Sequence, residues 1–183
     1  MKSSVFIHPN AIVESESIGE NTRIWAFVHI LGNAKIGVNC NICDHCFIED
    51  DVVIGDNVTV KSGIYIWNGA RIEDDVFLGP NVTFTNDIYP RSKVYPQKYP
   101  QTLIRQGASV GAHSVLLAGT IIGRHAIVGA GSVIAKNVGD FELVYGNPAR
   151  HRGYICKCKA KLRFGKRDVL KSSCGSVYSL KDG

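Results

Sequence analysis

Large apolar side chains recur at every sixth position along most of this chain, in two series that differ in phase. An α-helix repeats every 3.6 residues and a β-strand every two, so neither element alone produces a period of six. A six-residue period is typical of a parallel β-helix, in which each hexad contributes one short flat face. The two series are Phe6, Ile12, Ile18, Ile24, Ile30, Ile36, Ile42, Ile48, Ile54, Val60, Ile66, Ile72, Leu78 and Phe84, and then Ile104, Val110, Leu116, Ile122, Val128 and Ile134.

The residue four places after each large one is small or β-branched, as at Thr22, Ala34, Cys40, Ala70 and Ala126. Both positions are predicted to point inward, while polar residues between them turn a corner, where Gly and Asn suit positive φ angles. Three hexads close one triangular coil, so equivalent residues of successive coils stack about 4.8 Å apart. Stacking buries a ladder that no single hexad could bury, and the two series predict roughly six to seven coils. Twenty matched positions argue against a β-sandwich with accidental spacing.

Residues 85–103 interrupt the period with three prolines and three tyrosines, which predicts a loop extruded from one corner of the coil. Long loops on compact scaffolds are usually functional or disordered, and the aromatic residues argue against simple disorder. The loop is therefore expected to pack against a neighbour or a ligand. The coil is expected to end near Val138. This divides the chain into an all-β β-helix domain over residues 1–150 and a basic C-terminal extension over residues 151–183, for which a short helix and irregular structure are expected.

Charge and composition argue against nucleic-acid and membrane partners but do not indicate a specific function. The net charge of +5 is mild and much of it follows residue 146, so nucleic acid is not an expected partner. No run approaches the roughly 18 apolar residues of a membrane helix, and the N-terminal residues lack the apolar core of a signal peptide. A cytoplasmic protein with reduced thiols and no membrane partner is therefore expected. Cys40 and Cys46 are predicted to be buried thiols, because they take the small inward position of their hexads.

Three segments sharpen this picture: Asn81-Val-Thr-Phe-Thr-Asn-Asp87 with Tyr89-Pro-Arg-Ser-Lys93, then Ile66-Trp-Asn-Gly-Ala-Arg-Ile-Glu-Asp-Asp-Val-Phe-Leu-Gly-Pro80, and Val144-Tyr-Gly-Asn-Pro-Ala-Arg150. The hexads resemble those of the hexapeptide-repeat transferases. That resemblance implies a left-handed coil, which departs from the usual right-handed crossover. The loop segment is similar to N-acetyltransferases that act on dTDP- or UDP-linked 3-amino sugars. It is closer to the enzymes for 3-amino-3,6-dideoxyhexoses than to those for 3-amino uronates. The resemblance covers about residues 5 to 155.

The resemblance implies a homotrimer with three sites, each in a cleft between adjacent coils. It also implies acetyl-CoA as cosubstrate and a nucleotide-linked amino sugar as acceptor, with a product that feeds a surface glycan such as O-antigen or an S-layer. The acetyl-CoA arm is expected along the late hexads, where small residues let the backbone approach a pantetheine chain, and its phosphates near the cations that follow. The predicted cofactor-binding residues are Gly111, Ala112, Ala118, Gly129, Ala130, Lys136 and Arg150.

The chemistry requires a neutral amine beside the thioester carbonyl and a donor for the developing oxyanion, for which the backbone N–H of Gly111 is a candidate. The resembling enzymes rely on positioning, with the leaving CoA thiolate as final proton acceptor, so a His base is not obligatory. Six histidines are present, none of them in the loop, and three take polar corner positions: His8, His29, His45, His113, His125 and His151.

The predicted catalytic residues are therefore Asn86 and Asp87 at the start of the loop. Asn86 is expected to orient the acyl group or the amine, and Asp87 to bind the amine or a sugar hydroxyl. An Asn-Asp turn that merely starts the loop is the alternative. Residues predicted to bind the sugar or its diphosphate are Tyr89, Arg91 and Lys93, and Glu142 is expected to reach a neighbouring subunit's site.

The C-terminal cysteines raise the question of a metal. Cys156, Cys158 and Cys174 resemble a zinc-ribbon ending. A closed structural zinc site has four ligands, but Lys171 takes the place where a fourth is expected, and His151 would complete the set only at irregular spacing. The prediction is that no metal is required.

Other functions remain open: O-acetylation of a sugar hydroxyl, a γ-type carbonic anhydrase, and a non-enzymatic solenoid. A carbonic anhydrase needs three histidines around one metal, whereas His113 and His125 are two hexads apart and so lie on different faces. A surface-binding solenoid repeats one outward residue type on a flat face, whereas here the outward positions vary. The sequence therefore favours the N-acetyltransferase.

Overall fold

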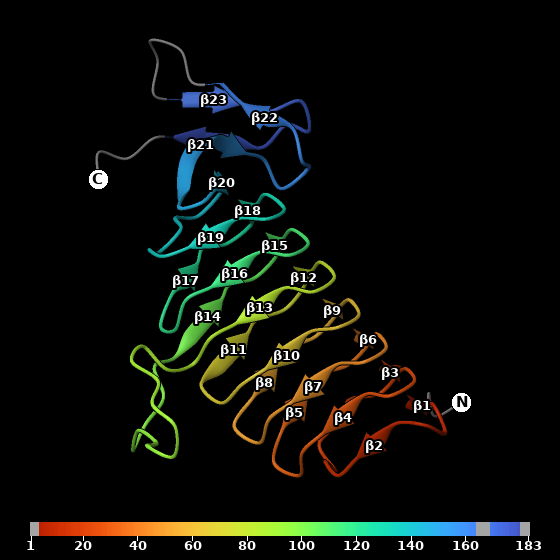
Figure 1. Ribbon diagram of the computed structural model, residues 1–183. Coiled ribbons are helices and arrows are strands. Elements are labelled where there is room, and N and C mark those ends of the chain that lie inside the picture. The colour runs from red at the N-terminus through yellow and green to blue at the C-terminus, as the bar shows by residue number, and fades with distance from the viewer. Residues whose placement is uncertain (1–3, 164–168, 180–183) are drawn as a thin grey trace.

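The chain forms a stack of short parallel strands around a triangular core. The computed structural model describes residues 4–163 and 169–179, and its regular elements are β-strands. Three sheets enclose the core, the first residues lie at one end of the stack, and the C-terminal extension lies at the other (Figure 1). The described part of the chain has no helix long and apolar enough to cross a bilayer.

The strands are assigned to four sheets. Sheet A contains, in spatial order, β1 (Phe6–Ile7), β3 (Arg23–Ile24), β6 (Asn41–Ile42), β9 (Thr59–Val60), β12 (Phe77–Leu78), β15 (Ser109–Val110), β18 (Ile127–Val128), β20 (Glu142–Gly146), β21 (Ala149–Ile155) and β22 (Lys161–Leu162). Sheet B contains β2 (Ile12–Val13), β4 (His29–Ile30), β7 (Phe47–Ile48), β10 (Tyr65–Ile66), β13 (Thr83–Phe84), β16 (Val115–Leu116) and β19 (Val133–Ile134). Sheet C contains β5 (Lys35–Ile36), β8 (Val53–Ile54), β11 (Ala70–Ile72), β14 (Thr102–Ile104) and β17 (Ile121–Ile122). The extension adds a hairpin of β23 (Val169–Lys171) and β24 (Val177–Ser179).

The predicted ladder of large residues forms the core. Ile24 pairs with Ile42, and Ile42 with Val60, so three hexads make each coil. Ile42, Ile48 and Ile66 are fully buried, because the three sheets enclose the inward side chains of the inner coils. The small residues expected to point inward are buried as well, including Ala34 and Cys40. Asn at the corners takes positive φ, as predicted.

The register of the first two hexads differs from the prediction. Ile7 pairs with Ile24 and Val13 with Ile30, so Ile7 and Val13 take the positions predicted for Phe6 and Ile12. Phe6 is 40% exposed and Ile12 58% exposed. The first coil is therefore one residue shorter than three hexads, and its two strands are the least buried of the stack.

The coil also continues beyond its predicted end near Val138. Val138 forms a parallel bridge with Ile122, and β20 pairs in parallel with β18, so that Val144 still lies over Val128. Eight strands of sheet A, from β1 to β20, belong to the stack, against the roughly six to seven coils expected. In place of the expected short helix, the described extension forms β21, β22 and the β23–β24 hairpin. The domain division at residue 150 stays a prediction, although β21 runs across it.

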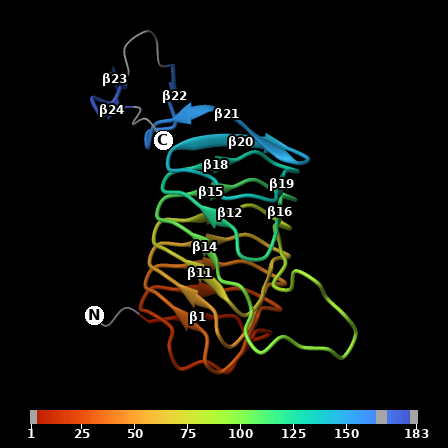
Figure 2. The ribbon, with the colours of Figure 1, turned by 90° about the vertical axis from the view of Figure 1, so that its left-hand side faces the viewer.

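Residues 85–101 leave the stack between β13 and β14 and form the expected loop (Figure 2). Arg71 pairs with Leu103, although the whole loop lies between them in the chain, so sheet C continues across the insertion. The loop therefore extends the coil sideways without breaking it.

Candidate functional site

Three rows of corners join the sheets. The A–B corner connects sheet A to sheet B and includes residues 43–46, 61–64, 79–82, 111–114 and 129–132. The B–C corner includes residues 31–34, 49–52 and 67–70, then the loop, and residues 117–120 and 135–138. The C–A corner includes residues 37–40, 55–58, 73–76, 105–108, 123–126 and 139–141. The predicted cofactor residues are divided between the first two rows and β21.

Gly111 at the A–B corner is pressed against the next coil. A Cβ at this position would lie 2.8 Å from Ala130 Cα and 2.9 Å from the carbonyl carbon of Gly129. The Gly111 N–H donates to the carbonyl oxygen of Val128 at 2.8 Å. The prediction that this N–H stabilises an oxyanion is therefore wrong, because the stacking of the coils already uses it.

The next residue, Ala112, has an N–H without an acceptor among the described residues. At the C–A corner the equivalent amides of Val38 and Asp56 donate to the carboxylates of Asp56 and Asp74, each at 2.8 Å. Above Ala112 the equivalent residue is Ala130, which has no side-chain acceptor. The A–B corner of the late coils therefore offers a backbone donor to a ligand.

The loop starts at the B–C corner beside Ala118. The Ala118 N–H donates to Thr85 Oγ1 at 3.0 Å, so Ala118 can offer its methyl group to a ligand but not this donor. Asp87 accepts the Tyr89 N–H at 2.9 Å, which is the Asn-Asp turn considered as the alternative role. Asn86 and Asp87 are half-buried. Farther out, Tyr89 is 83% exposed.

The outer loop residues Arg91 and Lys93 are exposed, and the Arg91 guanidinium contacts only the neighbouring Pro90 carbonyl among its hydrogen bonds in the described chain. Within one chain the structure therefore does not bring Tyr89, Arg91 and Lys93 together with the small residues of the A–B corner.

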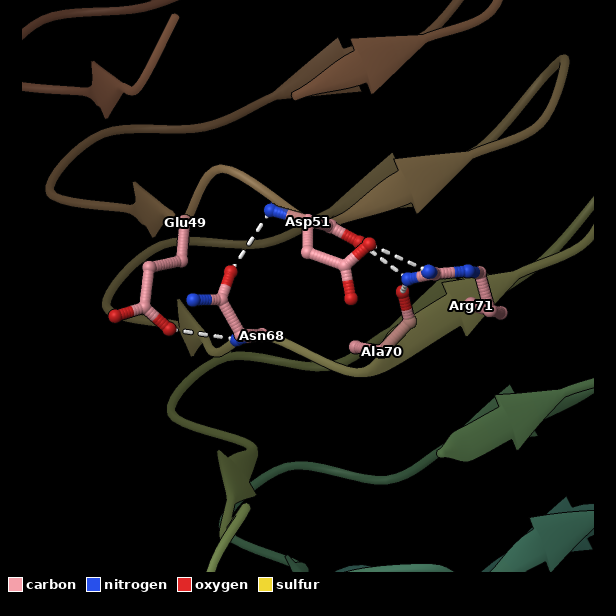
Figure 3. A network of polar contacts seen from close by, with 5 residues as sticks. All are labelled: Glu49, Asp51, Asn68, Ala70 and Arg71. Atoms are coloured by element: carbon pink, nitrogen blue, oxygen red, sulfur yellow. Dashed lines mark hydrogen bonds and ion pairs between the residues drawn. The ribbon is translucent and has the colours of Figure 1, made fainter. Parts of the chain in front are cut away.

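A polar network supports the base of the loop (Figure 3). Glu49 Oε2 accepts the Asn68 N–H at 2.6 Å, and the Asp51 N–H donates to Asn68 Oδ1 at 2.8 Å. The Arg71 guanidinium pairs with the Asp51 carboxylate at 2.6 Å and also donates to the Asp51 carbonyl. This corner and loop residues 97–99 line a cavity of about 260 Å³. The network fixes the corner against which the loop returns.

A second cavity, of about 300 Å³, lies at the C-terminal end of the coil. Its lining includes Lys136, Glu142, Arg150 and His151. Glu142 Oε1 lies 3.0 Å from His151 Nδ1, and Glu142 Oε2 accepts the Gly139 N–H at 2.8 Å. The two predicted phosphate-binding cations therefore share one cavity, while the Glu142 carboxylate is held by its own chain.

The model of the family described as bacterial transferase hexapeptide (six repeats) matches residues 17–50, 51–86 and 101–136, which is more than half of the chain. The chain belongs to this family. It is 63% identical over 178 residues to a dTDP-3-amino-3,6-dideoxy-alpha-D-galactopyranose 3-N-acetyltransferase of Aneurinibacillus thermoaerophilus, which covers 97% of this chain and 92% of the relative. The resemblance inferred from the motifs is thereby confirmed, and the protein is an acetyltransferase with a left-handed parallel β-helix fold.

Solved structures agree on the fold. A hexapeptide-repeat acetyltransferase of Vibrio cholerae, in complex with acetyl-CoA, is 22% identical with a TM-score of 0.56, covering 75% of this chain and 69% of that one. A UDP-N-acetylglucosamine acyltransferase of Campylobacter jejuni is 17% identical with a TM-score of 0.61, covering 81% of this chain and 74% of that one.

The sequence reasoning missed an aromatic surface on sheet B of this acetyltransferase. His29, Phe47 and Tyr65 form an edge-to-face row along the outer face, with ring centroids 5.5 and 6.5 Å apart, and Trp67 packs against Phe47 at 5.6 Å. Two hollows of about 300 Å³ lie on this surface, and the one nearer the late coils is also lined by Asn81 and His113. The sequence could have predicted this surface, because His29, Phe47 and Tyr65 are 18 residues apart and so take the same outward position in three successive coils.

The histidines of this acetyltransferase have ordinary structural partners. His45, His113 and His125 take positive φ at corners, as their hexad position predicts. His45 stacks on Phe27 with centroids 4.9 Å apart, and His125 stacks on Phe141 at 5.2 Å. His113 Nε2 lies 3.5 Å from Asn81 Nδ2.

Cys40 and Cys46 are buried thiols, as predicted. Burial raises the pKa of Cys46 to about 11, and burial also raises the pKa of Cys40. Both thiols are therefore uncharged near neutral pH and act as small apolar residues of the core.

Proposed function

We propose that this enzyme transfers the acetyl group of acetyl-CoA to the 3-amino group of dTDP-3-amino-3,6-dideoxygalactose. The observation that carries the proposal is the 63% identity, over 97% of the chain, to the Aneurinibacillus enzyme with that printed activity. Cytoplasmic synthesis of a nucleotide-linked sugar for a surface glycan fits this reaction. A glycosyltransferase would then consume the acetylated product.

The A–B corner is the proposed path of the pantetheine arm. The Ala112 N–H lacks an acceptor in the described chain and is flanked by small residues, including Gly129 and Ala130. A backbone donor in this position can bind the thioester carbonyl and stabilise the oxyanion that develops there. The oxyanion donor is therefore proposed to be Ala112 in place of Gly111. The CoA phosphates would lie at the end of the coil, against Lys136 and Arg150.

The proposed amine-binding residues lie on another edge of the prism. Sheet B separates the A–B corner from Asn86 and Asp87, and crossing its strands takes four or five residues, or about 13–16 Å of extended chain. One subunit therefore does not place its loop on its own Ala112 corner. A homotrimer solves this problem, because the B–C corner of one subunit can face the A–B corner of the next. The exposed aromatic surface on sheet B is suited to the contact between them.

In the proposed reaction the sugar amine attacks the thioester carbonyl carbon. A C–N bond forms, the oxyanion accepts a hydrogen bond from Ala112, and the C–S bond then breaks. The proton lost by the amine passes to the departing CoA thiolate, so the products are an amide and free CoA. Asn86 and Asp87 orient the amine, and no His base is needed for the balance of protons. Tyr89, Arg91 and Lys93 are proposed to bind the sugar or its diphosphate.

A panel assay tests the proposed function. Acetyl-CoA is supplied with dTDP-linked 3-amino, 4-amino and 3-hydroxy hexoses of otherwise matched structure, and the release of free CoA thiol is followed. The expected result is turnover with the 3-amino sugar alone. Turnover of the hydroxyl compound would make the enzyme an O-acetyltransferase, and no thiol release with any acceptor would contradict the proposal.

Replacement of Lys136 or Arg150 by methionine should raise the KM for acetyl-CoA about tenfold and leave kcat nearly unchanged. Each cation contacts the cosubstrate equally in the ground and transition states, so the loss is one of uniform binding, of about 1.4 kcal/mol. Acetyl-pantetheine, which lacks the nucleotide phosphates, should show the same kinetics with both variants and the parent enzyme. The control variant is Lys35→Met, an exposed lysine on sheet C near the other end of the coil. A similar loss with acetyl-pantetheine would show that the two residues do not bind phosphates.

A further inference from the structure

Two turns of the C-terminal extension have the same backbone geometry. In the turn of residues 156–160 the Cys156 N–H donates to the Ala160 carbonyl at 2.8 Å, and the Lys159 N–H donates to the Cys156 carbonyl at 2.7 Å. In the turn of residues 172–176 the Ser172 N–H donates to the Ser176 carbonyl at 2.8 Å, and the Gly175 N–H donates to the Ser172 carbonyl at 2.9 Å. The fourth residue of each turn, Lys159 in one and Gly175 in the other, takes a positive φ.

The shared hydrogen-bond pattern makes the residues of the two turns equivalent by position. Cys156 corresponds to Ser172, and Cys158 corresponds to Cys174. These four residues meet where the turns face each other. Cys156 Sγ lies 3.2 Å from Cys158 Sγ and 3.4 Å from Cys174 Sγ, while Cys158 Sγ lies 3.7 Å from Ser172 Oγ. Among the described residues these three thiols form a group of potential metal ligands within 4.8 Å of one another.

A tetrahedral zinc ion with Zn–S bonds of about 2.3 Å holds its sulfur atoms about 3.8 Å apart. The three thiols are close to that arrangement, and none of them is joined in a disulfide. Thiolates are the ligands that zinc prefers in structural sites, and a pair of facing turns is a common way to present them. We propose that Cys156, Cys158 and Cys174 bind one structural zinc ion, with the Ser172 hydroxyl at the fourth position.

From the sequence, Lys171 takes the place where a fourth ligand is expected and His151 would complete the set; the geometry favours neither position. Lys171 is the last residue of β23, is exposed and pairs with Val177. His151 lies at the cavity beside Glu142 and packs its ring against Tyr154 at 4.7 Å. Ser172, by contrast, is only 7% exposed and occupies the position that Cys156 has in the other turn.

The surroundings favour thiolates. The Tyr178 hydroxyl accepts the Lys157 N–H at 3.3 Å and lies 3.1 Å from Cys156 Sγ, within reach to donate its proton to a thiolate there. Cys174 Sγ also lies 3.4 Å from Ser176 Oγ. Donors of this kind orient metal ligands and stabilise their ionised form.

The zinc ion would attach the extension to the coil. The Tyr178 ring packs edge-on against Phe141 with centroids 5.1 Å apart, and Phe141 in turn stacks on His125 at the C–A corner. The metal would therefore fix the β23–β24 hairpin to the turn of residues 156–160, beside the end of the coil. It would be structural, so acetyl transfer itself would still need no metal.

The test uses the full chain, produced with added zinc and purified under reducing conditions without chelator. Elemental analysis should find about one zinc ion per chain, and replacement by Co²⁺ should give the thiolate-to-cobalt charge-transfer bands and visible bands of a tetrahedral site. Cys174→Ser should weaken zinc binding about a hundredfold, whereas Cys43→Ser, which removes a thiol on the coil, should leave it unchanged. Ser172→Cys completes a four-thiolate set and should tighten zinc binding about tenfold.

A second measurement does not depend on the variants folding. Removal of zinc from the parent enzyme should speed tryptic cleavage at exposed Lys171, and added zinc should reverse the effect. The proposal is overturned if the parent enzyme gives no cobalt charge-transfer band, or if Cys174→Ser retains zinc as tightly as the parent. A disulfide among these cysteines in the freshly reduced protein would also overturn it. These outcomes are independent of the acceptor panel, so failure here would leave the proposed acetyl transfer intact.

Discussion

Asn86→Ala and Asp87→Ala should each lower kcat/KM for the amino sugar about a hundredfold, with most of the loss in kcat. The proposed role of these side chains is to hold the amine on the line of attack at the thioester carbon. A loss of about 2.7 kcal/mol of transition-state stabilisation corresponds to that factor. The measurement is the rate of thiol release at saturating acetyl-CoA, with the sugar concentration varied. The KM for acetyl-CoA should change little.

Asp87→Asn separates the two roles that the structure allows for this residue. An asparagine oxygen can still accept the Tyr89 N–H, which Asp87 accepts at 2.9 Å, but it carries no charge. If the turn alone matters, Asp87→Asn will have near-parent activity. If the carboxylate binds the amine, it will resemble Asp87→Ala. Asn33→Ala is the matched control, because Asn33 is exposed on the same row of corners. Near-parent rates for both alanine variants would remove Asn86 and Asp87 from the site.

The fold could be predicted from the sequence because one periodic signal specifies it. A hexad places one large and one small residue inward, and the stacking of coils of three hexads follows from closure of the triangle. The start of the chain was misassigned because Phe6 and Ile7, like Ile12 and Val13, are adjacent apolar residues. Size alone does not choose between neighbours of this kind. The choice depends on stacking, and Ile7 and Val13 are the residues that lie below Ile24 and Ile30.

The site was harder to predict because hydrogen bonding depends on the coil above. The amides of Val38 and Ala112 occupy equivalent places on their corners. Within the described residues only the first has an acceptor, because Asp56 lies above it and Ala130 lies above the second. This comparison requires residues of successive coils, 18 positions apart, to be aligned in the sequence. The hexad pattern compares only positions six apart. The same alignment would have found the aromatic surface on sheet B.

In the C-terminal extension the sequence identified the cysteines but not the fourth residue of the cluster. Its cysteines were recognised, but their spacing put Lys171 in the place where a fourth ligand is expected. The register of the β23–β24 hairpin, in which Lys171 pairs with Val177, puts Ser172 at the start of the turn instead. A shift of one residue in a hairpin reverses the side to which each side chain points. Spacing alone therefore could not decide the ligand.

Gly111→Ala should lower the free energy of unfolding by about 3 kcal/mol or more, and the melting temperature by about 6–12 °C. The added Cβ would lie 2.8 Å from Ala130 Cα, and the atoms that it meets are backbone atoms of the next coil. A flexible side chain could move aside, but these atoms are held by the Gly111 N–H bond to Val128 and by the sheet above it. The measurement is thermal unfolding of parent and variant at equal protein concentration.

Two other corner glycines provide controls for the backbone contact. Gly32 has no atom within 4 Å of a built Cβ and no positive φ, so Gly32→Ala should be neutral or stabilise by about 0.4–1 kcal/mol. Gly131 also has space but a φ of +69°, so Gly131→Ala should cost about 1–2 kcal/mol from backbone strain alone. The loss of stability on substitution by alanine should therefore be largest at Gly111, smaller at Gly131 and absent at Gly32. This order distinguishes the effect of the backbone contact from that of the φ angle.

The Gly111→Ala variant also tests why this position is a glycine. If the small residue served mainly to admit the pantetheine arm, Gly111→Ala would raise the KM for acetyl-CoA while the melting temperature stayed near that of the parent. If stacking of the coils excludes a side chain, the melting temperature falls, while the folded fraction keeps its KM for acetyl-CoA. The contact with Ala130 supports the second result, because the missing Cβ would point along the stack and not toward solvent. The late-coil glycines then shape the corner, and the N–H of Ala112 remains the group that a ligand can reach.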